Sequence, residues 1–472
     1  HTMILSKTDY LHFLHCAKSL WLSKHKPEEY PKKTLSTYED KLALEGYEVQ
    51  RLVQDFLLKT PEAGCFSFEK IFTTDEGLYA QADIISENDD GTVNIYEVKS
   101  AGNIDKTHLI DATFQTITVE NSGLKVNAVY IVHLNKEYVR AGDLEVDKMM
   151  SFSLVTEQVK GLMEETVESV RSALEFLNKK EIDETSCSCL LLSKSHHCET
   201  FDYFNPKVPK PSIYNLPRLH KNKILTFTKE DRLSLEEIDE DEVSPNQLNV
   251  LKAAKSNSPV INQGIIRKFY EQVEYPVHFL DYETFSSAIP IVEGMKPHAH
   301  IPFQFSIHIK KDEDSAELEH YQYLAEEAEL PLSLIESMER VIYDKGSVVS
   351  WHKSFENTRN KEMALLYPDK ADFLNSVTER TIDLEDIFKG GYIDIAFGGY
   401  TSIKKVLPIL VPELTYDRMT VANGTDAMEA FSKIIEWEDN TEKTKLKKDM
   451  LAYCKLDTLA MVKIFEKINE II

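Results

Sequence analysis

The sequence has no excess of positive charge and no long apolar run. Its 472 residues carry 54 lysines and arginines against 79 aspartates and glutamates, a formal net charge of −25. This balance argues against a protein that coats nucleic acid nonspecifically, because phosphate binding is driven by Lys and Arg. It leaves room for a nuclease, in which metal ions and local basic patches hold the phosphate backbone. No apolar run approaches the ~18 residues of a membrane span. No basic segment followed by an apolar one opens the chain. We therefore expect no membrane partner, no secretion signal and a cytoplasmic location.

Cysteine is also scarce, with six residues spread unevenly along the chain. In a long chain without a secretion signal, such cysteines are expected as reduced thiols or metal ligands rather than disulfides. No internal repeat or low-complexity tract stands out. The length predicts two domains and a connector, and an apolar content of 42% is ample for their cores. The expected boundaries are 3–204, 205–270 and 271–472.

Two acids interrupt an apolar run at Phe279-Leu280-Asp281-Tyr282-Glu283. In a strand, alternate side chains share a face, so Asp281 and Glu283 would point the same way. Two carboxylates that close repel each other and raise a pKa unless a cation lies between them. Oxygen ligands of this kind suit a hard cation such as Mg²⁺ or Mn²⁺. A strand end with two solvated acids is the alternative, since an isolated D-x-E pair is common by chance.

Further polar residues follow this pair along the chain. A short strand is predicted at 348–352, and it is followed by Lys353-Ser354-Phe355-Glu356. Near the C-terminus, Tyr453 and Asp457 are four residues apart, so in a helix they share a face. A phenol and a carboxylate would therefore point together into one cleft.

The order of these motifs resembles that of the DnaQ-like exonucleases of the DEDD type, Tyr subclass. The resemblance covers roughly residues 271–472 and implies an α/β domain with an RNase H-like fold and 3′→5′ exonuclease activity. It implies two Mg²⁺ or Mn²⁺ ions about 3.5–4 Å apart that clamp the attacking water and the leaving oxygen. The implied metal ligands are Asp281, Glu283, Glu356 and Asp457. Tyr453 would orient the water, because a free pKa near 10 suits an orienting group better than a strong base.

The second motif departs from the usual pattern of that family. It usually reads N-x2-F-D, and here His352 stands in place of Asn and Glu356 in place of Asp. Asp383, within Arg380-Thr381-Ile382-Asp383-Leu384, is expected to support the fold or the path of the nucleic acid.

A second set of acids lies near the N-terminus. Strands are predicted at 77–85 and 93–99, joined by the turn signal Asp89-Asp90-Gly91. Asp83, Glu97 and Lys99 then form a D-x13-E-x-K pattern across a hairpin, in which Glu97 and Lys99 share a face. Two acids bind a divalent ion, and the nearby ammonium orients or polarises a water. The alternative is a surface Glu–Lys pair on an edge strand.

This pattern resembles the PD-(D/E)XK nucleases of the RecB-like branch. Members often carry a glutamine on a helix after the E-x-K strand, and Gln115 fits that place. Many also carry a histidine after a helical glycine. Gln50 stands nearby here instead, which leaves Glu45 or Glu48 as substitutes.

Four cysteines bracket this region. Cys16 precedes it, and Cys187, Cys189 and Cys198 follow an amphipathic helix predicted at 153–180. The layout resembles the RecB-like nucleases of the CRISPR-associated and AddB kinds, in which such cysteines bind a [4Fe-4S] cluster that ties the two ends of the domain together. The spacing C-x-C-x8-C differs from the commoner C-x2-C.

Two other interpretations of the cysteines remain open. One is a zinc site that uses His196 or His197, because zinc prefers tetrahedral sulfur and nitrogen ligands. The other is a set of free thiols without metal. Cys65 and Cys454 are expected to be small buried apolar residues.

The remaining segments give weaker signals. Residues 4–22 are predicted as one helix capped by Ser6 or Thr8. In the connector, the basic run 216–223 would contact phosphates or form a solvated loop, and the acidic stretch 236–242 is expected on the surface.

Taken together, the sequence resembles a bacterial family that joins a RecB-like region to a DnaQ-like region. This resemblance implies a metal-dependent nuclease in DNA repair or defence that acts on nucleic acid, with DNA favoured over RNA. The alternative is a nucleic-acid-binding or assembly protein in which one or both sites have decayed. His352, Glu356 and Gln50 favour that alternative.

Overall fold

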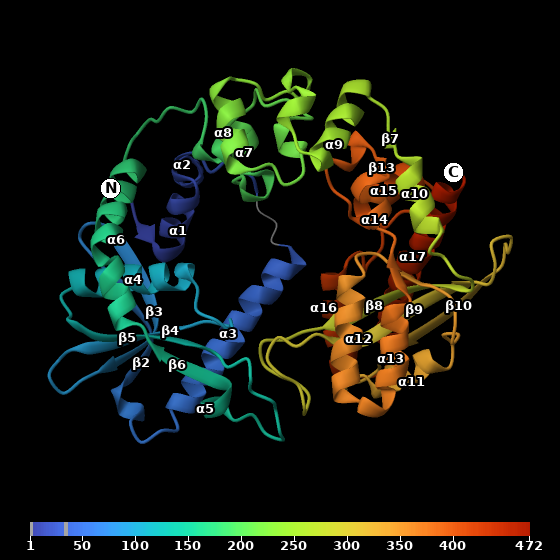
Figure 1. Cartoon of the computed structure of the whole chain (residues 1–472). Helices are drawn as coiled ribbons and strands as arrows, with labels where there is room; N and C mark the ends of the chain where they lie inside the picture. Colours follow the sequence, from blue (N-terminus) through green and yellow to red (C-terminus); the bar gives the residue numbers. More distant parts are fainter. Residues whose placement is uncertain (1–2, 33–35) are drawn as a thin grey trace. The chain divides into compact units, whose positions relative to one another are not determined.

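The computed structural model of the chain describes residues 3–32 and 36–472. The chain is a mixed α/β protein, as predicted, and it divides into two compact units (Figure 1). The first comprises His1–Lys207 with Ser287–Ala299, and the second comprises Val208–Ser286 with His300–Ile472. Among the described residues, no helix has both the length and the apolar character needed to cross a membrane.

A six-stranded sheet forms the centre of the first unit. Its strands are β1 (Leu5–Ser6), β2 (Phe66–Thr73), β3 (Leu78–Glu87), β4 (Val93–Val98), β5 (Val126–Leu134) and β6 (Met150–Leu154). β2, β3 and β4 are antiparallel, and the predicted turn around Gly91 joins β3 to β4. β4 and β5 are parallel, so a crossover must join them. The helix α4 (Lys106–Asn121) supplies that crossover.

Helices cover both faces of this sheet. They are α3 (Thr37–Leu57) on one face, and α4 and α6 (Thr156–Leu177) on the other. Because side chains alternate along a strand, Ile84 packs toward α3 whereas its neighbour Ile85 packs toward α4. Asp83 lies two residues from Ile85 and Glu97 lies two residues from Ile95, so both acids are on the face of the sheet that α4 covers.

The helix predicted at 4–22 is interrupted. The structure has β1 followed by α1 (Lys7–His15) and α2 (Ala17–His25). Ser6 is the N-cap of α1, as predicted, and forms a capping box with Asp9. The break lies at Cys16, whose backbone is extended with φ of −155° and whose thiol turns toward three later cysteines. In the same way, the helix predicted at 153–180 starts only at Thr156, because β6 pairs with β5 before it.

A five-stranded sheet in the order β10-β9-β8-β11-β12 forms the centre of the second unit. Its strands are β8 (Val277–Phe285), β9 (Ile301–Lys310), β10 (Leu318–Leu324), β11 (Val348–Ser350) and β12 (Thr381–Asp383). β8, β9 and β10 form an antiparallel meander. β11 and β12 run parallel to β8. The central strand β8 is therefore enclosed on both edges.

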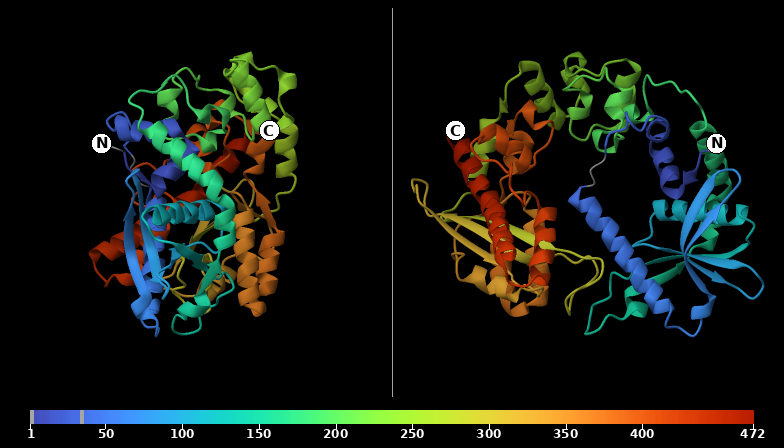
Figure 2. Two further views of the ribbon diagram at one scale, coloured as in Figure 1. Left: turned by 90° about the vertical axis from the view of Figure 1, so that its left-hand side faces the viewer. Right: turned by 180° about the vertical axis from the view of Figure 1, so that it is seen from behind.

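The two faces of this sheet carry different helices. One face is covered by α11 (Leu332–Glu339), α12 (Ser354–Leu366) and α13 (Ala371–Glu379), and the other by α15 (Ile403–Leu410) and α17 (Thr441–Asn469). α17 lies across β8 and β9 (Figure 2). Leu280 and Tyr282 pack toward α11 to α13, whereas Phe279 packs against Phe465 of α17. Asp281 shares the parity of Phe279 and faces α17.

Residues 205–270, expected as a connector, are folded over most of their length. They include α8 (Lys221–Lys229), α9 (Pro245–Ser256) and α10 (Gln263–Tyr270), and from Val208 they belong to the second unit. The acids of 236–241 are exposed, as expected, although Ile238 among them is fully buried. Glu242 of the same stretch forms an ion pair with Arg232 at 2.8 Å.

A segment between β8 and β9 belongs to the first unit, which no sequence pattern indicated. In Ser287–Ala299, Gly294 N and Met295 O exchange hydrogen bonds with the backbone of Arg140 at 2.8 and 3.1 Å. Ala288 N donates to Glu45 Oε1 at 3.2 Å. Lys41 also binds that oxygen, at 2.6 Å, so Glu45 serves as a structural acceptor.

Candidate metal-binding sites

Four carboxylates meet in the second unit. Asp281 and Glu283 come from β8, Glu356 from the first turn of α12, and Asp457 from α17. Glu283, Glu356 and Asp457 are only 7%, 4% and 9% exposed. Their charges act on one another, so the structure brings together all four acids that the sequence analysis singled out.

Burial and mutual repulsion weaken these acids. Burial raises the pKa of Asp281 well above its usual range, and the charges of Asp457, Glu283 and Glu356 add to the increase. Burial and Asp457 raise the pKa of Glu283 in the same way. Burial raises the pKa of Glu356 to about 8 and that of Asp457 to about 6. A cation placed among the four would reverse these shifts.

The donor set fits a hard divalent cation. Carboxylate oxygens are the ligands that Mg²⁺ and Mn²⁺ prefer. Among the described residues, Glu356 Oε2 is buried without a hydrogen-bond partner. A buried, unsatisfied carboxylate oxygen is costly, and a metal ion would supply its missing partner.

The tyrosine of the last motif lies beside these acids. Tyr453 is 4% exposed, and burial together with the charges of Asp457, Glu283 and Asp281 raises the pKa of its phenol. The phenol therefore stays protonated at neutral pH and acts as a hydrogen-bond donor rather than a base.

Three residues of this site were missed from the sequence. Cys454 is buried, as expected, but its sulfur lies 3.7 Å from Asp281 Oδ2 and within 4.8 Å of the ligand oxygens of Asp281 and Glu283. Tyr416 donates a hydrogen bond to Asp457 Oδ1. Lys404 lies 5.8 Å from the Tyr453 ring centre. The position of Cys454, three residues before Asp457, was an available signal; Tyr416 and Lys404 gave none.

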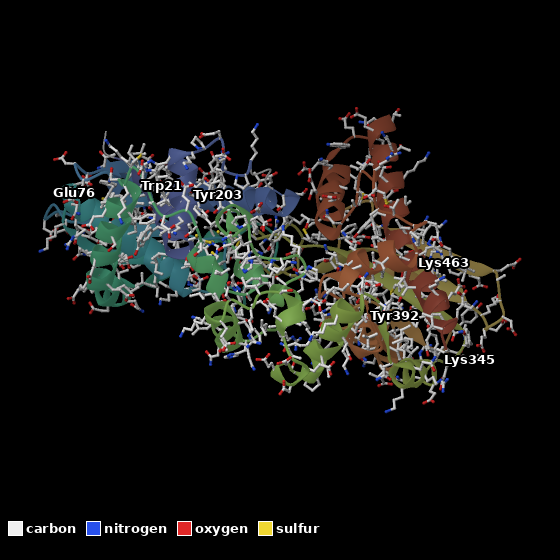
Figure 3. The ribbon with its side chains drawn as sticks, turned by 90° about the horizontal axis from the view of Figure 1, so that it is seen from above. Trp21, Glu76, Tyr203, Lys345, Tyr392 and Lys463 are labelled. Carbon is white, nitrogen blue, oxygen red and sulfur yellow. The ribbon has the colours of Figure 1, made fainter. Side chains whose placement is uncertain are left out.

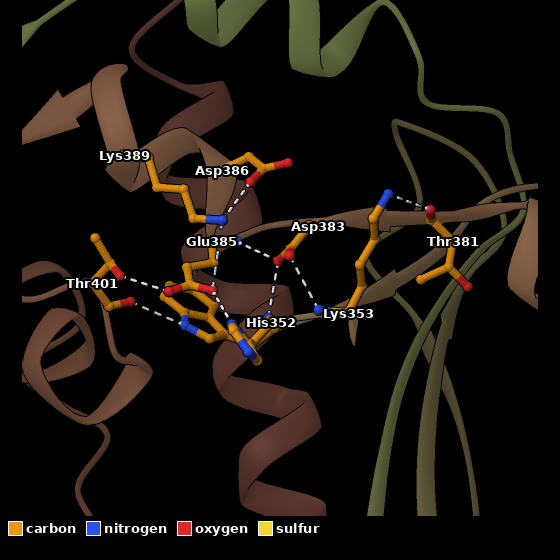
Figure 4. Close-up of polar contacts among 9 residues, drawn as sticks. His352, Lys353, Thr381, Asp383, Glu385, Asp386, Lys389 and Thr401 are labelled. Atoms are coloured by element: carbon orange, nitrogen blue, oxygen red, sulfur yellow. Dashed lines mark hydrogen bonds and ion pairs between the residues drawn. The ribbon is translucent and has the colours of Figure 1, made fainter. Parts of the chain in front are cut away.

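Asp383 holds the turn that delivers Glu356. Figure 4 shows it beside His352, Lys353 and Glu385. Its carboxylate accepts the backbone N–H groups of His352, Lys353 and Glu385 at 2.9, 3.1 and 3.1 Å. The chain leaves β11 through His352, which has a left-handed φ of 60°, and enters α12. Asp383 thus supports the fold, which is one of the two roles expected for it.

The side chain of His352 contacts Glu385, which is not one of the four carboxylates. Its Nδ1 lies 2.9 Å from Glu385 Oε2, and Thr401 Oγ1 donates to the other oxygen of Glu385 at 2.6 Å. The residue that replaces the family's asparagine therefore belongs to a polar network around Glu385 (Figure 4).

The first unit holds the second acidic site. Ile84 of β3 pairs with Tyr96 of the antiparallel strand β4. Asp83 therefore lies opposite Glu97, one residue further along. Val98 N donates to Asp83 Oδ2 at 2.8 Å. Gln115 of α4 donates to Glu97 Oε2, so the predicted glutamine does reach the predicted acid.

Two ammonium groups contact Glu97. Lys99 lies 2.9 Å and Lys7 lies 2.5 Å from Glu97 Oε1. Burial alone would raise the pKa of Glu97, but Lys99 and Lys7 outweigh it and lower that pKa to about 2. Burial and the charge of Glu97 raise the pKa of Asp83 to about 8. Lys7 was not predicted for this site, because it lies far away in sequence.

A pocket of about 340 Å³ opens beside Asp83, and Gln50 lines it. Glu48 is exposed. Lys41 and Ala288 contact Glu45 Oε1, and among the described residues Glu45 Oε2 is buried without a hydrogen-bond partner. Neither expected substitute for the missing histidine, Glu45 or Glu48, is in the described lining of the pocket, whereas Gln50 is.

The four cysteines converge, as their layout suggested. Cys16, Cys187, Cys189 and Cys198 are all buried, and their sulfurs lie within 4.8 Å of one another. Cys187 and Cys198 are 4.0 Å apart. The same region ties α2 to the segment after α6, because Trp21 (labelled in Figure 3) donates to Lys179 O at 2.8 Å.

These separations bear on what the thiols would hold. Around a tetrahedral zinc with bonds of about 2.3 Å, sulfurs stand about 3.8 Å apart. A cubane cluster places an iron between each sulfur and the centre, which spreads the sulfurs further. His196 and His197 are not in the group. His197 instead contacts Leu192 O at 3.0 Å, so the ligands would be four thiolates.

Comparison with known proteins adds little about chemistry. A family model described as "Domain of unknown function (DUF2779)" matches residues 278–402. Uncharacterized protein MG366 of Mycoplasma genitalium is 27% identical over 213 residues, which cover 41% of this chain and 32% of that protein. The MG366 homolog of Mycoplasma pneumoniae is 26% identical over 206 residues, with 39% and 31% covered. The chain thus spans about a third of the length of these relatives.

A solved structure titled "Crystal structure of SSO0001" aligns over 36% of this chain and 76% of that chain, with 12% identity and a TM-score of 0.21. The segment matched by the family model contains Asp281, Glu283 and Glu356 but ends before Tyr453 and Asp457.

Proposed function

We propose that the chain is a metal-dependent nuclease that hydrolyses phosphodiester bonds, with its main site at the four carboxylates of the second unit. The observation that carries this proposal is the convergence of four acids from β8, α12 and α17, three buried and Asp281 half-buried, beside a buried phenol. Their raised pKa values and the unpartnered Glu356 Oε2 support cation binding. The motif order supports 3′→5′ exonuclease activity on nucleic acid, with DNA favoured over RNA.

The chain's own residues would divide the work. Asp281, Glu283, Glu356 and Asp457 would hold two Mg²⁺ or Mn²⁺ ions, which supply Lewis-acid activation of water and stabilisation of the leaving oxygen. Tyr453, kept protonated by burial, would donate a hydrogen bond that orients the water. Lys404, whose charge opposes that of Glu283 and Asp457, would neutralise part of the phosphate charge.

The first unit supports a second nuclease site. Asp83 and Glu97 would bind one divalent ion beside the pocket that Asp83 lines, and Gln115 would fix the orientation of Glu97. The competing interpretation is a nucleic-acid-binding platform with a decayed site. That interpretation is favoured by the full engagement of Glu97, whose two oxygens are occupied by Lys7, Lys99 and Gln115.

A digestion assay tests the main proposal. End-labelled single- and double-stranded DNA and RNA are incubated with wild-type protein in Mg²⁺ or Mn²⁺ and compared with Asp281→Ala. Asp372→Ala is the matched control, because Asp372 is an exposed aspartate of α13, on the opposite face of the sheet. We expect metal-dependent shortening from 3′ ends that Asp281→Ala loses by several orders of magnitude and Asp372→Ala keeps. Equal shortening by Asp281→Ala and wild type would show that this site is not the exonuclease.

A further inference from the structure

The two ammonium groups at Glu97 are in different surroundings. Lys99 is the lysine of the E-x-K motif, and its ammonium is held on two sides, 2.6 Å from Asp111 Oδ2 and 2.9 Å from Glu97 Oε1. Its side chain is 17% exposed. Asp111 is itself buried on α4. Lys99 is therefore committed to a buried ion-pair network.

Lys7 contacts the same carboxylate oxygen and is the more exposed of the two lysines. It is the first residue of α1, directly after the N-cap Ser6, and β1 is fixed beside β3 by the pairing of Ser6 with Tyr79. This arrangement sets the Lys7 ammonium 2.5 Å from Glu97 Oε1. Within the described part of the chain, the Lys7 ammonium contacts one carboxylate, that of Glu97. The Lys7 side chain is 26% exposed.

The pocket distinguishes the two lysines further. Lys7 and Asp83 line it together with Gln50 and Gln81, whereas Lys99 and Glu97 are absent from its described lining. A phosphate that enters this pocket would therefore meet Lys7 and not Lys99. The remaining lining is mostly polar. It offers amide and hydroxyl donors from Gln50, Gln81 and Tyr79 and includes one further carboxylate, Glu69.

We propose that Lys7 is the phosphate-binding residue of the first unit's site and that Lys99 positions Glu97. The proposal rests on the proposed nuclease function of that site and assigns a phosphodiester of nucleic acid as the ligand. Without a divalent cation, Lys7 neutralises Glu97 and competes with a cation for Oε1. When Glu97 Oε1 ligates a cation, the Lys7 ammonium loses this partner and pairs with a phosphate oxygen in the pocket. Lys99 stays on Asp111 throughout.

The test uses the full chain carrying Asp281→Ala, so that the carboxylate site of the second unit does not contribute. Lys7→Met, Lys7→Arg and Lys99→Met are added separately. Lys160→Met is the matched control, since Lys160 is an exposed lysine of α6 that pairs with Glu157 at 2.9 Å. Circular dichroism first checks that each variant folds. If Lys7→Met does not fold, Lys7→Arg is used to test the role of Lys7.

Two binding measurements do not depend on turnover. Calorimetric titration with Mn²⁺ alone should show several-fold tighter binding in Lys7→Met, because the nearer of the two ammonium groups that contact Glu97 Oε1 is gone. Binding of a short single-stranded DNA in Ca²⁺ should weaken about 10-fold in Lys7→Met and lose roughly one unit of salt slope, as expected for one lost phosphate contact. Lys7→Arg should retain the DNA affinity. Lys160→Met should match its parent in both measurements.

Other outcomes would overturn the assignment. If Lys7→Met leaves both affinities unchanged, Lys7 is only a structural ion pair. If Lys99→Met and not Lys7→Met weakens DNA binding and the salt slope, Lys99 is the phosphate ligand. Failure of the proposed hydrolysis can be told apart from failure of the Lys7 assignment. In that case the Asp281→Ala parent would cleave no substrate in Mg²⁺ or Mn²⁺, and the two affinity measurements would still decide the role of Lys7.

Discussion

Tyr416 donates a hydrogen bond from its hydroxyl to Asp457 Oδ1, so a phenol from outside the Tyr453–Asp457 pair holds the carboxylate of that pair. The ring centres of Tyr416 and Tyr453 are 6.0 Å apart, and the Lys404 ammonium lies 5.5 Å from the former and 5.8 Å from the latter. Two phenols and one ammonium are therefore grouped beside the carboxylates. Both phenols favour the ionised form of Asp457, Tyr416 more strongly than Tyr453, and we assign to Tyr453 the further task of orienting water.

Replacing each tyrosine should separate those tasks. The Tyr416 hydrogen bond favours the ionised form of Asp457 and opposes the rise in its pKa. Tyr416→Phe should therefore raise that pKa further, move the acidic limb of the pH–rate profile to higher pH, and weaken Mn²⁺ binding. Tyr453→Phe should keep Mn²⁺ affinity and slow turnover by about 10–1000-fold if the phenol orients water. Measured pH–rate profiles and Mn²⁺ titrations of both variants check this, and an unshifted profile for Tyr416→Phe would contradict it.

The carboxylates also predict an unusual dependence of stability on pH. Burial raises the pKa of Glu356 to about 8, above the value of about 4.3 for an unfolded chain. Between these two pKa values the folded state binds more protons than the unfolded state. The free energy of unfolding therefore falls as pH rises through this range, by about 1.4 kcal/mol per pH unit for each such group. In chelator, the melting temperature should be lower at pH 8 than at pH 5.5.

Two controls make that prediction specific. Mn²⁺ should restore the melting temperature at pH 8 and do little at pH 5.5, because protonated carboxyls bind it poorly. Glu356→Gln should reduce the pH slope in chelator. A melting temperature in chelator that rises steadily from pH 5.5 to pH 8 would show that these acids ionise normally in the fold.

The structure shows which features a pattern of residues can predict. Strand alternation correctly placed Asp281 and Glu283 on one face, and helical spacing correctly placed Tyr453 and Asp457 together, because both depend only on local geometry. The D-x13-E hairpin was predictable for the same reason.

Features that depend on distant chain segments were not predictable. Lys7 reaches Glu97 only because β1 pairs with β3, and Tyr416 reaches Asp457 from the segment between α15 and α16 (Gly424–Glu436). The break at Cys16 was missed because helix propensity carries no information about a thiol drawn toward residues far away in sequence. The membership of Ser287–Ala299 in the first unit depends on backbone hydrogen bonds with Arg140, which leave no trace in side-chain pattern.

Asp383→Ala tests whether this acid is structural. Its carboxylate accepts three backbone N–H groups in the turn before α12 and at the end of β12. Loss of such caps costs about 1–2 kcal/mol, so the free energy of unfolding in urea should fall by roughly that amount. Exonuclease activity should fall as well, because Glu356 sits on the helix that the turn starts. A variant with wild-type stability and no Mn²⁺ binding would instead identify Asp383 as a metal ligand.

The four-cysteine site makes the last prediction. Its sulfurs lie within 4.8 Å of one another, close to the spacing of about 3.8 Å around a single tetrahedral ion, although the family resemblance implies a [4Fe-4S] cluster. We expect anaerobically purified protein to carry about one zinc per chain, no acid-labile sulfide and no brown colour. Iron and sulfide in similar amounts, with absorbance near ~400 nm, would establish the cluster instead.

In either case Cys189→Ser should lower solubility and melting temperature, because a metal held by residues from both ends of the first unit contributes to its folding. Cys65→Ser is the matched control, since Cys65 is exposed and outside the group, and it should leave metal content and melting temperature unchanged.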